Sequence, residues 1–102
     1  MELTNAQIND TMVEYPDMVA AAEVAWKTAV VERQRTEALA YFRLKATCAG
    51  EKVTERWLEN KVLVDDEVHQ AKLDEIVKEA EYNRLYEKLM CAKRMASLRA
   101  AF

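Results

Sequence analysis

ATCAGEKVT, residues 46–54, decides the fold, because it holds the single glycine of the chain, Gly50. The only proline is Pro16, so the 102 residues contain very few strong breakers of regular structure. Sheet proteins need glycine and proline at many turns. A glycine near the middle of a helical chain can adopt the positive φ that ends one helix and lets the chain reverse. The sequence therefore predicts an all-α fold, a long antiparallel helical hairpin that turns at Gly50 and carries two short capped helices.

Capping residues mark the predicted helices on both sides of this turn. Thr4 and Gln7 form a capping box, and Pro16 suits the first turn of a new helix. Thr54 and Asp65 are favourable N-caps in the second half of the chain. These signals predict a single domain over residues 1–102, with a short helix over 4–14, a long helix over 17–49, a short helix over 54–64 and a long helix over 66–101.

The composition excludes several classes of protein. The chain is 51% hydrophobic and 32% charged, which is typical of a folded helical protein. No apolar run approaches the roughly 20 residues of a membrane span, so we expect no membrane partner. The first residues lack the basic and apolar segments of a secretory signal, so we expect a cytoplasmic protein.

Residue types that carry catalysis are sparse. His69 is the only histidine, and the two cysteines, Cys48 and Cys91, fall at opposite ends of the predicted hairpin, so neither a metal site nor a disulfide is expected. One glycine cannot build a phosphate-binding loop. The carboxylates follow the spacing of solvated helix faces. We therefore expect a protein that is not an enzyme and has no cofactor.

The stretch from Met18 to Val31 is apolar except at Glu23, Lys27 and Thr28. A helix that is apolar around most of its circumference needs neighbours on several sides. This pattern predicts a homo-oligomer with interface residues on that stretch. In the alternative, the short helices cover it and complete a monomeric bundle. The predicted interface residues are Val19, Ala22, Trp26 and Val30.

Two other stretches of the long helices have clear patterns. Residues 32–37 are polar on every side, which predicts a solvated band or a charged interface. The last helix has apolar residues at a spacing of three to four, which is typical of a core-facing stripe. That predicted core stripe consists of Tyr82, Leu85, Leu89, Ala92 and Ala96.

Charge is distributed unevenly, although the net charge is only −3. Residues 51–82 are acidic, whereas residues 26–45 and 83–102 are basic and include tyrosines. Cations and aromatic rings together suit single-stranded DNA, whose phosphates attract cations and whose bases stack on rings. In the alternative, the cations balance acids on neighbouring subunits. The predicted nucleic-acid-binding residues are Arg33, Arg35, Arg43, Lys45, Arg84 and Lys88.

The segments LKAT (44–47), GEKVTE (50–55), DDEV (65–68) and AEY (80–82) carry a family resemblance. Over roughly residues 17–100 the chain resembles small phage-encoded helical proteins grouped with UvsY-type recombination mediators. One departure is the Asp-Pro expected at the start of the last helix, which is Asp65-Asp66 here. The resemblance implies a ring-forming protein of the bacterial host cytoplasm that helps a recombinase replace a single-strand binding protein on DNA.

A second function remains open at the level of sequence. The chain can instead be a purely protein-binding phage factor, such as an inhibitor of a host defence enzyme or an assembly chaperone. The acidic residues 51–82 would then form its working surface.

Overall fold

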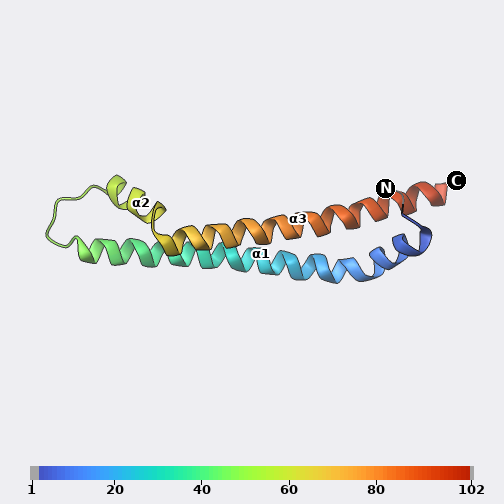
Figure 1. Ribbon diagram of the computed structural model, residues 1–102, viewed down its shortest axis with the longest axis horizontal. Helices are drawn as coiled ribbons and strands as arrows, with labels where there is room; N and C mark the ends of the chain where they lie inside the picture. The colour runs from blue at the N-terminus through green and yellow to red at the C-terminus, as the bar shows by residue number, and fades with distance from the viewer. Residues whose placement is uncertain (1–2, 102) are drawn as a thin grey trace. The chain divides into compact units, whose positions relative to one another are not determined.

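The computed structural model describes residues 3–101, and its regular structure in that range is entirely helical (Figure 1). Helix α1 spans Asn5–Thr47, α2 spans Glu55–Leu63, and α3 spans Asp66–Ala101. The two long helices pack against each other as a hairpin, and short α2 lies between them in the sequence. The predicted all-α hairpin is confirmed. None of the described helices combines the length and the apolarity that crossing a membrane requires.

The chain reverses after α1 in the way that Gly50 predicts. Gly50 has a φ of +87°, in the left-handed region that favours glycine. The preceding turn is closed by the N–H of Cys48, which donates to the carbonyl of Leu44 at 2.9 Å. A Cβ placed on Gly50 would meet no atom within 4 Å, so only its backbone conformation requires glycine.

The predicted caps form in all three helices. At α1, the N–H of Thr4 donates to Gln7 Oε1 at 2.8 Å, and the N–H of Gln7 donates to Thr4 Oγ1 at 3.2 Å. At α2, Thr54 Oγ1 accepts from the N–H of Trp57 at 3.1 Å. At α3, Asp65 Oδ1 accepts from two N–H groups of the first turn. These bonds satisfy N–H groups that have no partner inside the helix, and so fix where each helix begins.

The predicted break before Pro16 is absent, because α1 continues through Pro16. Proline removes one hydrogen bond of the helix and crowds the carbonyl four residues earlier. Packing on both sides offsets this loss: Thr11 and Val19 are buried, and Tyr15 packs on the core. The predicted helices over 4–14 and 17–49 are therefore parts of one helix.

Packing divides the chain into two compact units, each containing part of α1 and part of α3. Among the described residues, unit 1 contains 3–26 and 78–101; unit 2 is Lys27–Val77. The core of unit 1 consists of Val19, Ala22, Leu85 and Leu89, with Tyr15, Tyr82 and Met90 packed against it. The core of unit 2 consists of Ala40, Val62 and Val68, with Tyr41 and Leu44 packed against it.

Candidate interaction surfaces

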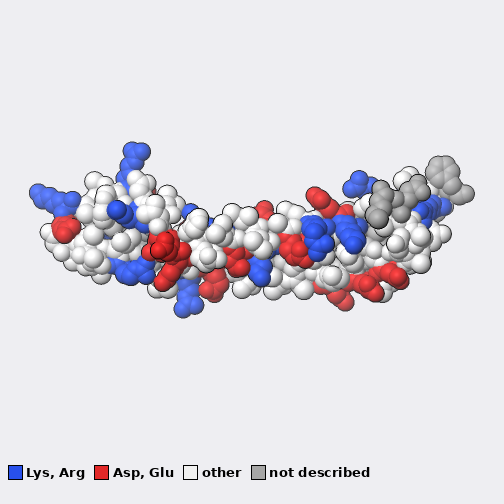
Figure 2. Space-filling model, viewed as in Figure 1, with Lys and Arg blue, Asp and Glu red and all other residues white. Residues whose placement is uncertain are grey.

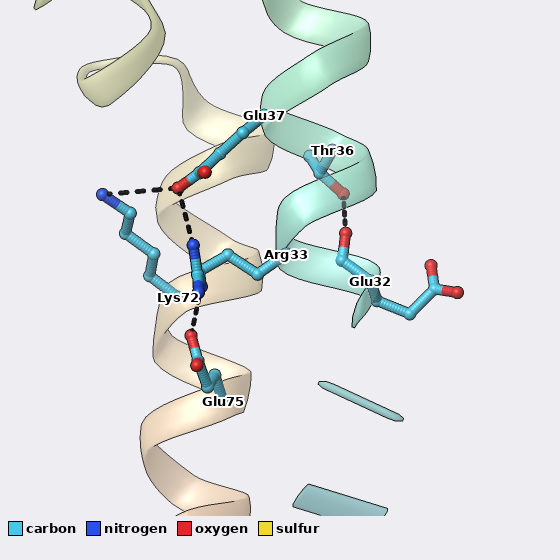
Figure 3. A network of polar contacts seen from close by, with 6 residues as sticks. All are labelled: Glu32, Arg33, Thr36, Glu37, Lys72 and Glu75. Carbon is cyan, nitrogen blue, oxygen red and sulfur yellow. Dashed lines mark hydrogen bonds and ion pairs between the residues drawn. The ribbon is translucent and has the colours of Figure 1, made fainter. Parts of the chain in front are cut away.

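Arg33, a predicted DNA-binding residue, lies in an ion-pair network inside unit 2 (Figure 3). Its Nη1 donates to Glu37 Oε1 at 3.1 Å, and its Nε donates to a carboxylate oxygen of Glu75. Lys72 Nζ lies 3.8 Å from the same oxygen of Glu37. The hydrogen bond to Glu75 raises the pKa of Arg33 despite partial burial. Arg33 therefore joins α1 to α3, and the polar band over residues 32–37 contributes to a charged contact within the chain.

Arg43 and Lys45 also have partners in unit 2. The guanidinium of Arg43 pairs with Asp65, the N-cap of α3. Lys45 Nζ lies 5.7 Å from the centre of the Tyr41 ring, a cation–π contact. The hydroxyl of Tyr41 in turn donates to Glu55 at 2.8 Å. Of the four predicted cations in unit 2, Arg35 alone has no such partner in the described part of the chain.

The other two predicted cations lie in unit 1, so the structure does not gather all six into one site. Arg84 donates to both carboxylate oxygens of Glu81, at 2.8 and 3.1 Å. These bonds lower the pKa of Glu81 and raise the pKa of Arg84. Lys88 Nζ lies 4.9 Å from the centre of the Tyr15 ring.

The four residues predicted for the oligomer interface differ in how far they are buried within the single chain. Val19 and Ala22 are buried in the core of unit 1, which leaves little of them for a partner. Trp26 stacks on Tyr82, with ring centres 5.5 Å apart. Its indole N–H is buried without an acceptor among the described residues. Val30 is half-buried.

Within the stretch predicted to assemble, Met18, Val24 and Val31 are exposed. Large apolar side chains are also exposed on the outward sides of both long helices of unit 2. On α1 they are Val31, Leu39 and Phe42, which are 58 to 64% exposed; we call this surface the α1 outer face. On α3 they are Leu73, Ile76 and Val77, which are 43 to 63% exposed; we call this surface the α3 outer face. Exposed apolar side chains that gather on one side of a helix favour a site of protein contact.

A third surface surrounds Trp57 on α2, a residue absent from the predicted sites. Trp57 is 38% exposed, and Lys61 Nζ lies 5.5 Å from the centre of its ring. Lys52 and Arg56 are exposed close by in the sequence, and Figure 2 shows Lys and Arg side chains over the end of unit 2 that carries α2. Tryptophan and lysine four residues apart on one helix is a sequence signal that could have indicated this surface.

Several carboxylates of the acidic region 51–82 form ion pairs or hydrogen bonds within the chain. Asp65, Glu75 and Glu81 bind arginines, and Glu55 accepts from Tyr41. Glu59 instead lines an open groove of about 540 Å³ between α1 and α2, together with Gln34, Glu37, Ala38, Tyr41, Val62 and Leu63. The region therefore contains both carboxylates that pair within the chain and carboxylates that face outward.

Among residues 3–101, no group of three or more His, Cys, Asp or Glu side chains is arranged to hold a metal ion. The two cysteines are free thiols, Cys48 in unit 2 and Cys91 in unit 1. Comparison with protein families, curated proteins and solved structures finds no match for this chain. The surfaces themselves must therefore indicate the function.

Proposed function

We propose that this protein is a non-enzymatic binding module that acts through protein–protein contacts along its helices, and that a second copy of the chain is its first partner. The observation that carries the proposal is the exposure of large apolar side chains on the α1 outer face and the α3 outer face. Single exposed apolar residues are common on monomers. Here three such side chains lie on each outer face, so each face offers more apolar surface than a single exposed residue does. Covering these faces would release ordered water.

The size of the chain supports the same proposal. Domains of about 100 residues bury a modest share of their surface, and the core of unit 2 contains few large side chains. Association adds buried apolar area that a single copy cannot provide. A pair of helices with outward apolar faces is therefore suited to assembly and to binding other helices.

The direct test is the mass of the purified protein in solution. We expect sedimentation velocity and light scattering to show an oligomer that dissociates on dilution. The double variant Phe42→Ser/Ile76→Ser should weaken association, because it places a hydroxyl on each outer face. Val64→Ser is the matched control, since Val64 is 71% exposed but follows α2. A wild-type chain that is monomeric at every concentration would refute the proposal.

Binding of single-stranded DNA is the second candidate, and the surface around Trp57 favours it. An exposed indole can stack on a base while Lys52, Arg56 and Lys61 neutralise phosphates. Under this candidate the protein acts as a recombination accessory factor, with a recombinase and a single-strand binding protein as further partners. This role rests on the resemblance to recombination mediators described above.

Binding to labelled oligo-dT tests the DNA candidate separately from assembly. Trp57→Leu should weaken binding roughly tenfold, because stacking on one aromatic ring contributes about 1–3 kcal/mol. Phe42→Leu is the control, since it alters an exposed aromatic residue on a different helix. No binding at low salt would leave protein contact as the sole function, and equal binding by both variants would place the DNA contact away from Trp57.

A further inference from the structure

The two outer faces of unit 2 differ in the charges that accompany their apolar side chains. The segment Lys27–Thr47 of α1 carries an excess of cations, whereas the segment Asp66–Val77 of α3 carries an excess of acids. On α1 the charged residues are Lys27, Arg33, Arg35, Arg43 and Lys45, with Glu32 and Glu37. On α3 they are Asp66, Glu67, Asp74 and Glu75, with Lys72.

Part of this charge is already used within the chain. Arg33 and Arg43 bind Glu75 and Asp65, and these pairs hold α1 against the start of α3. Arg35 lies two residues from Arg33, which places it on the opposite side of α1 beside Val31 and Phe42. It is therefore a cation of the α1 outer face, which also carries one acid, the exposed Glu32, seven residues before Leu39 and pointing away from the Arg33 network (Figure 3).

The acids of the α3 outer face can be identified in the same way. Asp66 and Asp74 are exposed and form no ion pair among the described residues. Asp66 lies seven residues before Leu73, two helical turns away on the same side of α3, and Asp74 lies three residues before Val77, which makes the two neighbours on the helix surface. The α3 outer face therefore combines Leu73, Ile76 and Val77 with free carboxylates.

We infer that copies of this chain assemble with the α1 outer face of one copy packed on the α3 outer face of the next. This inference rests on the proposed self-association and specifies its geometry. Two α3 outer faces would bring Asp66 and Asp74 toward the same acids of the partner, whereas the α1 outer face offers the cation Arg35. Like charges at a contact are costly, and opposite charges attract. Covering the α3 outer face therefore favours the α1 outer face of another copy over a second α3 outer face.

Such a contact is heterologous, because different surfaces of the two copies meet. Each added copy leaves one α1 outer face and one α3 outer face uncovered at the ends. The contact therefore repeats from copy to copy and is not limited to a dimer.

Charge reversal on each face tests the inference. Arg35→Glu should weaken assembly of the pure variant at least about tenfold, because the introduced carboxylate would oppose the acids of α3. Asp66→Lys/Asp74→Lys should do the same, because the introduced ammonium groups would oppose Arg35. An equimolar mixture should assemble again, because each altered face meets its complement and each unaltered face meets the other. Glu59→Lys is the control on α2 and should assemble like the wild type.

Three outcomes separate the possible failures. A wild-type monomer would refute self-association itself. A wild-type oligomer that is sensitive to Arg35→Glu alone would show that two α1 outer faces meet, and would refute the unlike pairing. A mixture that fails to assemble, while circular dichroism shows both variants fully helical, would refute it as well. The single variant Asp74→Lys checks that a loss of assembly in the double variant does not come from the change at Asp66, which lies in the first turn of α3.

Discussion

At the scale of single residues, several charged side chains of unit 2 form contacts within the chain. These contacts stabilise the fold and leave the charges less available to a ligand. Arg33 binds Glu75 across the hairpin, forty-two residues away in the sequence. Both side chains are mostly covered, with 23 and 19% of their surface exposed. Partial burial strengthens such a contact relative to a fully solvated pair. A cation of this kind holds two helices together and is a poor ligand for a phosphate.

Glu75→Gln tests this role of Arg33. The amide keeps the shape of the side chain but removes its charge, so we expect the free energy of unfolding to fall by about 1 kcal/mol. The effect should shrink at high salt, which screens the wild-type pair. Glu79→Gln is the control, since Glu79 is an exposed acid of α3 without an ion pair in the described residues. Equal effects of the two variants in urea denaturation would contradict the structural role.

Tyr41 gives a prediction that depends on pH. Its hydroxyl donates to Glu55, and this hydrogen bond raises the pKa of Tyr41 because ionisation would place two negative charges together. Since the pKa is higher in the folded state, the stabilisation is present at neutral pH and is lost as pH rises through that pKa. In an absorbance titration of the four tyrosines, Tyr41 should ionise above the ordinary tyrosine range. Glu55→Gln should shift this late ionisation downward, and an unchanged curve would contradict the contact.

At the scale of helices, local signals predicted most of the boundaries. Thr4, Thr54 and Asp65 cap helices as expected, and Gly50 ends the first long segment. These signals work because a cap or a positive φ depends on a few neighbouring residues. The apolar spacing in α3 likewise identified Leu85, Leu89 and Ala92 as buried.

The predictions that depend on distant residues were less complete. Pro16 satisfies local rules for a helix start, yet packing around Thr11, Tyr15 and Val19 keeps α1 continuous. The sequence predicted that Val19 meets another chain, whereas it packs on Leu85 and Leu89 of its own chain. The partners of Arg33 and Arg43 could not be assigned because they depend on the register between α1 and α3. The exposure of Trp57 depends on how α2 packs on the rest of unit 2, which the sequence pattern does not indicate.

Pro16→Ala distinguishes a continuous α1 from a break. In the interior of a helix, proline costs about 3 kcal/mol relative to alanine. Because α1 continues through Pro16, alanine should raise the free energy of unfolding, by roughly 1–3 kcal/mol after allowing for the more flexible unfolded chain. At the first turn of a separate helix the same change would be nearly neutral. Thr54→Ala is a reference change with the opposite effect, since loss of this N-cap should lower the free energy of unfolding by about 1 kcal/mol.

At the scale of the whole molecule, assembly and stability should be linked. Each copy has small cores in its two units and leaves large apolar side chains uncovered. A partner that binds only the folded chain adds to its stability by mass action. The melting temperature should therefore rise with protein concentration, which it does not do for a monomer.

The outer-face variants sharpen this last prediction. Phe42→Ser/Ile76→Ser alters exposed side chains, so the variant should melt close to the wild type in dilute solution, where both are dissociated. On concentration the wild type should gain stability while the variant gains less, because only the wild type covers its apolar faces. Scanning calorimetry over a range of concentrations measures both trends. Equal slopes would place the stabilising contact elsewhere on the chain. A variant that melts much lower even when dilute would show instead that Phe42 or Ile76 supports the fold of the single copy.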